Sequence, residues 1–215
     1  MVELHSNYTF EGERQRINGV YPSRHAFHET LEVTHGFTPW FETGFYVFSS
    51  IQPGTGWEWV GDNIRPRVRV PEEWDWPVGV SLSTEFGYMR RAFTEDTWSW
   101  ELRPIIDKQF GPLYLSFNPA FEKSVHGLNS SRGWDFAPSG KVSYELSKVV
   151  AVGVEYYSSL GTLPHFNGWR EQEHTIIPVL DLGVSEDWEL NMGLGFGLTR
   201  STEDLIVKLI VGYRF

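Results

Sequence analysis

The sequence contains no cysteine, which excludes a disulfide-linked scaffold and any metal site built from thiolates. It also lacks an apolar run of about eighteen residues, the length that a membrane-spanning helix requires. Basic residues are scarce: 18 Lys and Arg stand against 28 Asp and Glu, and the net charge of −10 argues against a nucleic-acid partner. The 215 residues suffice for one domain, which we expect to span residues 1–215.

The sequence is rich in two-residue alternation, most clearly in the segment from Trp188 to Phe215. From Trp188 to Leu198 every second residue is apolar, and the residues between them are glycine, polar or charged. This pattern puts all the apolar side chains on one face of a strand. After a polar turn at 200–204 the alternation resumes, with Ile206 and Ile210 as exceptions.

The same pattern recurs along the whole chain and predicts about twelve strands. We therefore expect an all-β fold, a single up-and-down antiparallel transmembrane β-barrel with both termini on the short-turn, periplasmic side. Tight connections are expected near Gly36, Pro71, Lys108, Ser147 and Ser185, and longer ones at 11–24, 52–63, 123–133 and 158–173. A soluble β-sandwich with aromatic edges is the alternative, but it does not require short and long connections to alternate.

Tryptophan residues gather at the predicted strand ends, where the two membrane interfaces of a barrel would lie. Such aromatic girdles suit a bilayer because an indole ring is apolar with one polar edge. The expected girdle residues are Trp40, Trp74, Trp76 and Trp188 at the short-turn end, and Trp57, Trp59, Trp98 and Trp134 at the loop end.

The alternate strand positions opposite the apolar ones would face the barrel interior, and we call them the inward parity. These positions are heavily charged. The expected lumen residues are Glu42, Arg65, Arg67, Arg69, Glu85, Glu101, Arg103, Asp107, Glu122, Lys141, Glu145, Glu155, Asp181 and Lys208. Charges lining a lumen indicate a selective solute path. They also suit a barrel closed by mutually satisfied ion pairs. A barrel of about twelve strands lies between small filled barrels and wide porins, so both interpretations stand.

Five prolines fall inside the predicted strands, all on the outward parity: Pro66, Pro104, Pro119, Pro138 and Pro178. Proline removes a hydrogen-bond donor from the sheet and belongs at edges or bulges. A closed barrel has no edge, so we expect bulges or locally lost pairing at these positions.

Three segments carry a resemblance to known proteins: Gly111–Pro119, Val154–Tyr157 and Gly195–Thr199. They resemble a family of bacterial outer-membrane barrels that carries the provisional label of the MetA pathway of phenol degradation or of a putative transporter. The resemblance covers the chain from about Glu29 to Phe215 and implies an outer-membrane β-barrel. It supplies no catalytic residues.

Other residues capable of chemistry form no known pattern. The loop from Ser124 to Ser131 also contains His126, Asn129 and Ser130, but it does not reproduce the motif of outer-membrane phospholipase A. The spacings of the histidines match no metal signature. They lie at His5, His28, His35, His165 and His174. Gly193, Gly195 and Gly197 lie inside a strand, where glycine clears space in the lumen. We expect no cofactor, no metal and no catalytic residue.

The function expected from the sequence is a narrow passive channel for small solutes, with Arg65, Arg67, Arg69 and Arg103 attracting anionic or aromatic molecules. A structural barrel closed by ion pairs and a lipid-modifying enzyme are the alternatives. The expected partners are the lipid bilayer with its lipopolysaccharide, and the barrel-assembly machinery, which would bind the terminal strand through Tyr213 and Phe215. We expect location in the bacterial outer membrane, with Met1 standing where a signal peptide has been removed.

Overall fold

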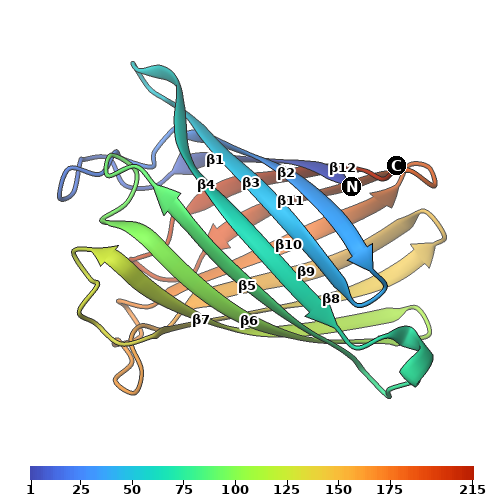
Figure 1. Ribbon diagram of the computed structural model, residues 1–215. Helices are drawn as coiled ribbons and strands as arrows, with labels where there is room; N and C mark the ends of the chain where they lie inside the picture. The colour runs from blue at the N-terminus through green and yellow to red at the C-terminus, as the bar shows by residue number, and fades with distance from the viewer.

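The computed structural model covers residues 1–215 and forms a closed antiparallel barrel (Figure 1). Each strand pairs with the next along the chain, and β1 pairs with β12 to close the ring. The strands are β1 (Val2–Glu11), β2 (Phe27–Thr38), β3 (Phe41–Gln52), β4 (Gly56–Arg69), β5 (Gly79–Met89), β6 (Asp96–Phe110), β7 (Leu113–Gly127), β8 (Asp135–Ser147), β9 (Val150–Ser159), β10 (Glu173–Gly183), β11 (Trp188–Gly197) and β12 (Leu205–Tyr213). The predicted fold class is confirmed.

The two termini lie at one end of the barrel together with the connections 39–40, 111–112, 148–149 and 184–187 (Figure 1). Residues 12–26 and 160–172 form the longest connections at the opposite end. Three predicted lengths are wrong. The connection expected at 123–133 comprises only residues 128–134, because β7 continues to Gly127. Residues 52–63 are not a loop, because β3 and β4 continue to a tight turn at 53–55. The connection at Pro71 is not tight, because residues 70–78 include a short 3-10 helix at Glu72–Trp74.

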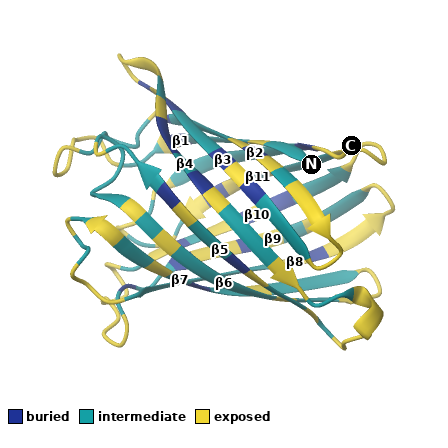
Figure 2. Ribbon diagram, in the orientation of Figure 1, coloured by how far each residue is buried: buried dark blue, intermediate teal, exposed yellow.

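The outer face of the barrel is apolar and exposed, and the exposed positions alternate along the strands in Figure 2. Phe45, Phe117 and Val142 have exposed fractions of 50%, 50% and 51%. A soluble protein would bury such side chains, whereas a barrel in a bilayer presents them to lipid. No helix of the structure is long and apolar enough to cross a membrane.

The tryptophans lie at the two ends of the barrel. Trp40, Trp74, Trp76 and Trp188 lie at the end that holds the termini, in or beside the connections 39–40, 70–78 and 184–187. Trp98 lies near the start of β6 and Trp134 directly before β8, at the loop end. Trp57 and Trp59 also lie toward the loop end, but within β4 rather than in a loop, where they pair with Ile51 and Ser49.

The in-strand prolines cause lost pairing rather than bulges. Between β4 and β5 the pairs stop at Ile64 and resume at Arg67 in the same register, on either side of Pro66. Between β6 and β7 they stop at Leu102 and resume at Ile106, and Pro104 lies in the gap. The register shifts occur elsewhere, for example between Phe48 and Ser49. Of the two expected alternatives, local loss of pairing occurs at these prolines and bulges do not.

Gly193 illustrates why the inward face of β11 contains glycine. A Cβ at this position would lie 2.7 Å from Cγ2 of Ile177 and 2.9 Å from Cγ1 of Val179. These two side chains belong to the inward face of β10 and are only 3% and 5% exposed. The glycine thus leaves room for two side chains that fill the barrel interior.

Candidate functional site

The interior of the barrel is the candidate functional site. The register places all of the predicted lumen residues on the inward parity of their strands. Arg69 lies at the end of the barrel that holds the termini, where its Nε donates to the carbonyl of Pro39 at 2.7 Å. Glu145 is exposed at the same end, where it accepts a hydrogen bond from Gln109 at 3.2 Å.

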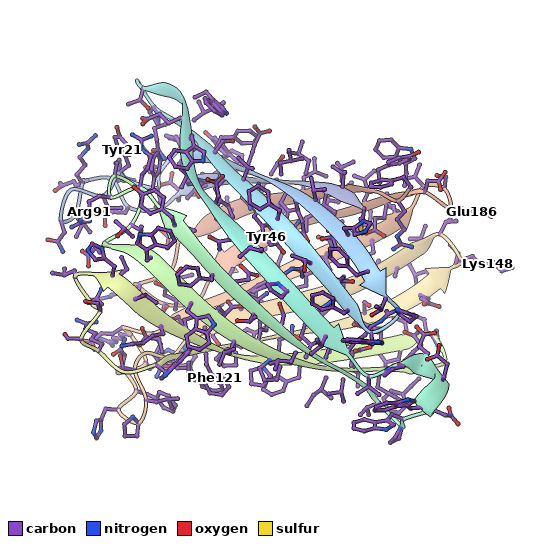
Figure 3. All side chains as sticks on the ribbon, viewed as in Figure 1. Tyr21, Tyr46, Arg91, Phe121, Lys148 and Glu186 are labelled. Carbon is purple, nitrogen blue, oxygen red and sulfur yellow. The ribbon has the colours of Figure 1, made fainter.

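The first charged cluster lies on β1 to β4. Glu32 is 3% exposed and pairs with Arg65. Arg67 contacts Glu42 at 2.8 Å, and the Nε2 of His5 lies 3.5 Å from Glu32. The Arg65 guanidinium also lies 5.4 Å from the ring centre of Tyr46, the labelled residue near the middle of the barrel in Figure 3. Both arginines therefore have a carboxylate partner.

The second cluster lies on β8 to β12 and centres on Glu155, which is 5% exposed. Lys208 pairs with Glu155, and Lys141 lies 3.3 Å from Glu155 and 2.8 Å from Asp181. Asn191 donates to Asp181 at 2.7 Å and to Glu155 at 3.3 Å. Two lysines and two carboxylates thus balance one another.

The third group is a row of carboxylates, which we call the acidic row: Glu85, Glu101, Glu122 and Asp135 on β5 to β8. Glu85 lies directly opposite Glu101, Glu101 opposite Glu122, and Glu122 opposite Asp135. Arg103 contacts Glu101 at 2.7 Å, and no other member has a basic partner within 4.0 Å. Directly opposed like charges are unfavourable in a sheet, so this row is an exception to the balanced pattern.

The arginines are consequently not free to attract anions, contrary to the expectation from the sequence. Arg65, Arg67 and Arg103 each have a carboxylate partner, and Arg69 lies at the rim. Carboxylates outnumber basic residues on the inward parity of the strands. The basic residues there are Arg65, Arg67, Arg69, Arg103, Lys141 and Lys208. The carboxylates are Glu3, Glu32, Glu42, Glu58, Glu85, Glu101, Asp107, Glu122, Asp135, Glu145, Glu155, Glu173, Asp181 and Glu189.

Water reaches the interior unevenly. Lys141 and Asp181 line a cavity of about 450 Å³ at the end that holds the termini. The Arg103 side chain, near the middle of β6, is 35% exposed, and the inward-facing Tyr157 is 43% exposed. Glu32 and Glu155, in contrast, are nearly inaccessible. The interior therefore combines water-accessible side chains with buried ionic clusters.

A loop covers part of the opposite mouth. Residues 12–26 contact the connection 90–95: the amide of Tyr21 donates to the carbonyl of Ala92 at 2.8 Å, and Arg91 donates to the carbonyl of Asn18 at 2.9 Å. A cavity of about 310 Å³ lies between this loop and the inward residues His28 and Gln52. Figure 3 labels Tyr21 and Arg91 at this end, and Lys148 at the other.

The residues considered for catalysis are not assembled into a site. The ring of His126 contacts the hydroxyl of Thr97 at 2.8 Å, whereas Ser124 lies on the inward face of β7, opposite Ser99. Ser130 donates to the carbonyl of Gly127 at 3.0 Å. No serine is within hydrogen-bond reach of His126, as a nucleophile and its base must be.

The histidines also differ in their surroundings. His174 is 2% exposed, contacts the hydroxyl of Tyr156 at 2.6 Å and stacks on Trp169 at 4.1 Å, which is a structural role. His5 lies with Glu3 and Glu32, and the potential ligand atoms of this group are all within 4.8 Å of one another.

Several interior residues were not among the lumen residues predicted from the sequence. Glu32, Asp135 and Asn191 all lie on the inward parity of their strands, so alternation alone could have identified them. Their partners follow from the register between strands. The register depends on turn geometry, which the alternation does not specify.

The fold defines the class of protein to which the chain is similar: β-barrels of the bacterial outer-membrane type. Over 100% of this chain, the KdgM porin aligns with a TM-score of 0.63 and 13% identity, covering 98% of KdgM. The NanC porin aligns with a TM-score of 0.66 and 9% identity over 100% of both chains. An outer membrane channel from Pseudomonas putida F1 aligns with a TM-score of 0.58 and 11% identity, covering 95% of that channel.

At such identities the likeness shows the fold alone. No protein-family model matches the sequence, and no curated protein sequence is significantly similar to it. The resemblance to the MetA-pathway family therefore stays a prediction.

Proposed function

We propose that the protein is a narrow passive channel for small solutes in the bacterial outer membrane. The observation that carries this proposal is water access to inward-facing side chains: Arg103 is 35% exposed near the middle of β6, and Tyr157 is 43% exposed on β9. A barrel filled only to hold itself together would pack these side chains, as small filled barrels do.

The solved structures of similar fold support this proposal. Two of them are porins, and one KdgM structure is described as a complex with disordered oligogalacturonate. Membership in the MetA-pathway barrel family belongs to the same proposal. The bilayer with its lipopolysaccharide would then surround the apolar outer face, and a small solute would use the interior.

A closed structural barrel is the second candidate, and a specific observation favours it. Glu32 and Glu155 are 3% and 5% exposed, and each is paired with a basic residue from a strand that is not its direct neighbour. If these clusters meet across the interior without a gap, no solute passes. The two candidates differ in whether polar molecules reach the acidic row from both ends.

Accessibility of single cysteines separates the two candidates, because the chain has no cysteine of its own. Glu122 faces inward and is exposed, whereas Phe121, its neighbour on β7, packs against Phe136 on the outer face. In planar bilayers, a charged, membrane-impermeant thiol reagent should reduce the conductance of the Glu122→Cys variant. The Phe121→Cys variant is the matched control and should not respond. If the reagent changes the conductance of neither variant, the proposed channel is contradicted.

A further inference from the structure

We infer that the passage selects cations over anions, and that the acidic row confers this selectivity. The inference rests on the proposed channel function and names the class of solute that the channel takes. It follows from the alignment of charges across four neighbouring strands, which only the register of the folded barrel reveals.

The acidic row is unusual because its members repel one another. Glu85, Glu101 and Glu122 are consecutive direct neighbours across β5, β6 and β7, and Asp135 continues the row on β8. Arg103 offsets one of these charges through its contact with Glu101 at 2.7 Å. The other carboxylates of the row have no basic partner within 4.0 Å, so their negative potential attracts mobile cations when they are ionised.

Asn63 provides a second, independent observation beside the row. This side chain on β4 is 8% exposed, and its Nδ2 donates to Glu85 at 3.4 Å. Its Oδ1 is buried and has no hydrogen-bond partner. Buried polar atoms are rarely left unsatisfied. This oxygen lies in the space that the missing side chain of Gly87 leaves free, and as an unpaired acceptor it adds to the negative potential beside Glu85.

The basic residues of the interior do not oppose this selectivity. Lys141 and Lys208 are neutralised by Glu155 and Asp181, and Arg67 is paired with Glu42. An anion that passes the acidic row therefore meets uncompensated negative charge and gains little from the paired cationic groups. Inorganic cations and small organic ammonium ions experience the opposite field.

The reversal potential in a potassium chloride gradient tests the inference. At an ionic strength of about 0.1 M, where charges are screened over about 10 Å, the wild-type protein should prefer potassium over chloride. Glu85→Gln and Glu122→Gln should each lower the permeability ratio by about two-fold, because each removes one charge at roughly 8 Å from a passing ion. Glu72→Gln, in the connection 70–78 outside the barrel wall, is the control and should leave the ratio unchanged.

The outcomes separate the inference from the channel function on which it rests. A conducting protein that prefers chloride, or whose permeability ratio in both glutamine variants equals that of the wild type, overturns the cation selectivity alone. A folded protein that does not conduct overturns the channel and the selectivity together. The variants should still fold, because neutralising a member of the row removes repulsion rather than a favourable contact.

Discussion

Lys208 on β12 reaches across β10 and β11 to pair with Glu155 on β9. The inward position directly opposite Lys208 on β11 is Gly193, which has no side chain in the way. Glu155 is 5% exposed and receives additional contacts from Lys141, Asn191 and Tyr157. This pair joins two distant parts of the barrel wall through the interior, where few water molecules compete for the charges.

Replacing Lys208 with methionine should destabilise the barrel. Glu155 would lose one of its two lysine partners while staying buried, which costs roughly 1–3 kcal/mol. Urea unfolding of the protein in lipid vesicles, followed by tryptophan fluorescence, measures the loss. The Lys208→Met/Glu155→Gln double variant should recover part of it, because the uncompensated charge is gone. Lys148→Met, at an exposed turn, is the control, and equal stability of Lys208→Met and Lys148→Met would contradict the prediction.

Replacing Gly193 with alanine should destabilise the barrel by overpacking its interior. The new Cβ would meet Ile177, Val179 and the carbonyl oxygen of Pro178 at 2.7–2.9 Å. Such insertions into a packed interior cost roughly 1–3 kcal/mol. Gly36→Ala is the matched control within a strand, because a Cβ there meets nothing within 4 Å. The prediction fails if the two alanine variants unfold at the same urea concentration.

Loosening the loop at 12–26 should increase the conductance. Tyr21 lies against Phe93 with ring centres 5.2 Å apart, and Arg91 holds the carbonyl of Asn18. The Tyr21→Ala/Arg91→Ala variant removes both side-chain contacts and should let the loop leave the mouth. Single-channel recordings should then show a larger or more variable open level. Arg132→Ala, in the exposed connection 128–134, is the control and should have the conductance of the wild type. If the double variant also has the wild-type conductance, the loop does not restrict the mouth and the prediction is contradicted.

Deleting Phe215 should impair assembly in cells more than stability in vitro. Phe215 is 81% exposed and lies beyond the end of β12, so its loss should change the unfolding free energy by less than about 0.5 kcal/mol. The terminal aromatic residue resembles the assembly signal of outer-membrane barrels. The exported deletion variant should therefore reach the outer membrane in smaller amounts, while Phe110→Ala, at the same end of the barrel, should not. Unchanged amounts would exclude this role of Phe215.

The fold could be predicted from alternation because a bilayer imposes it on every strand. Lipid outside and water inside require apolar and polar side chains at alternate positions. The segment from Trp188 to Phe215 therefore already shows the pattern of barrel strands. Alternation failed at residues 52–63. A register shift beside Trp59 breaks the two-residue period there, so the outer part of β4 resembles a glycine-containing loop in the sequence.

The interior could be predicted only in part. Parity placed Glu85, Glu101 and Glu122 inside the barrel, but it did not show that they are direct neighbours of one another. That alignment depends on the register, which turns and bulges determine. The sequence therefore suggested free arginines in a mixed lumen, whereas the folded barrel pairs Arg65, Arg67 and Arg103 with carboxylates and leaves other carboxylates without basic partners.

The most direct test is the single-channel conductance of the refolded protein, measured on material whose folded state is first verified by a heat-dependent shift in gel mobility. A narrow water-accessible passage predicts a shifted band together with a small ohmic conductance that favours potassium over chloride. A shifted band without conductance would contradict the channel and show that the interior clusters close the barrel. Protein that is soluble without detergent and shows no shifted band would contradict the membrane barrel itself.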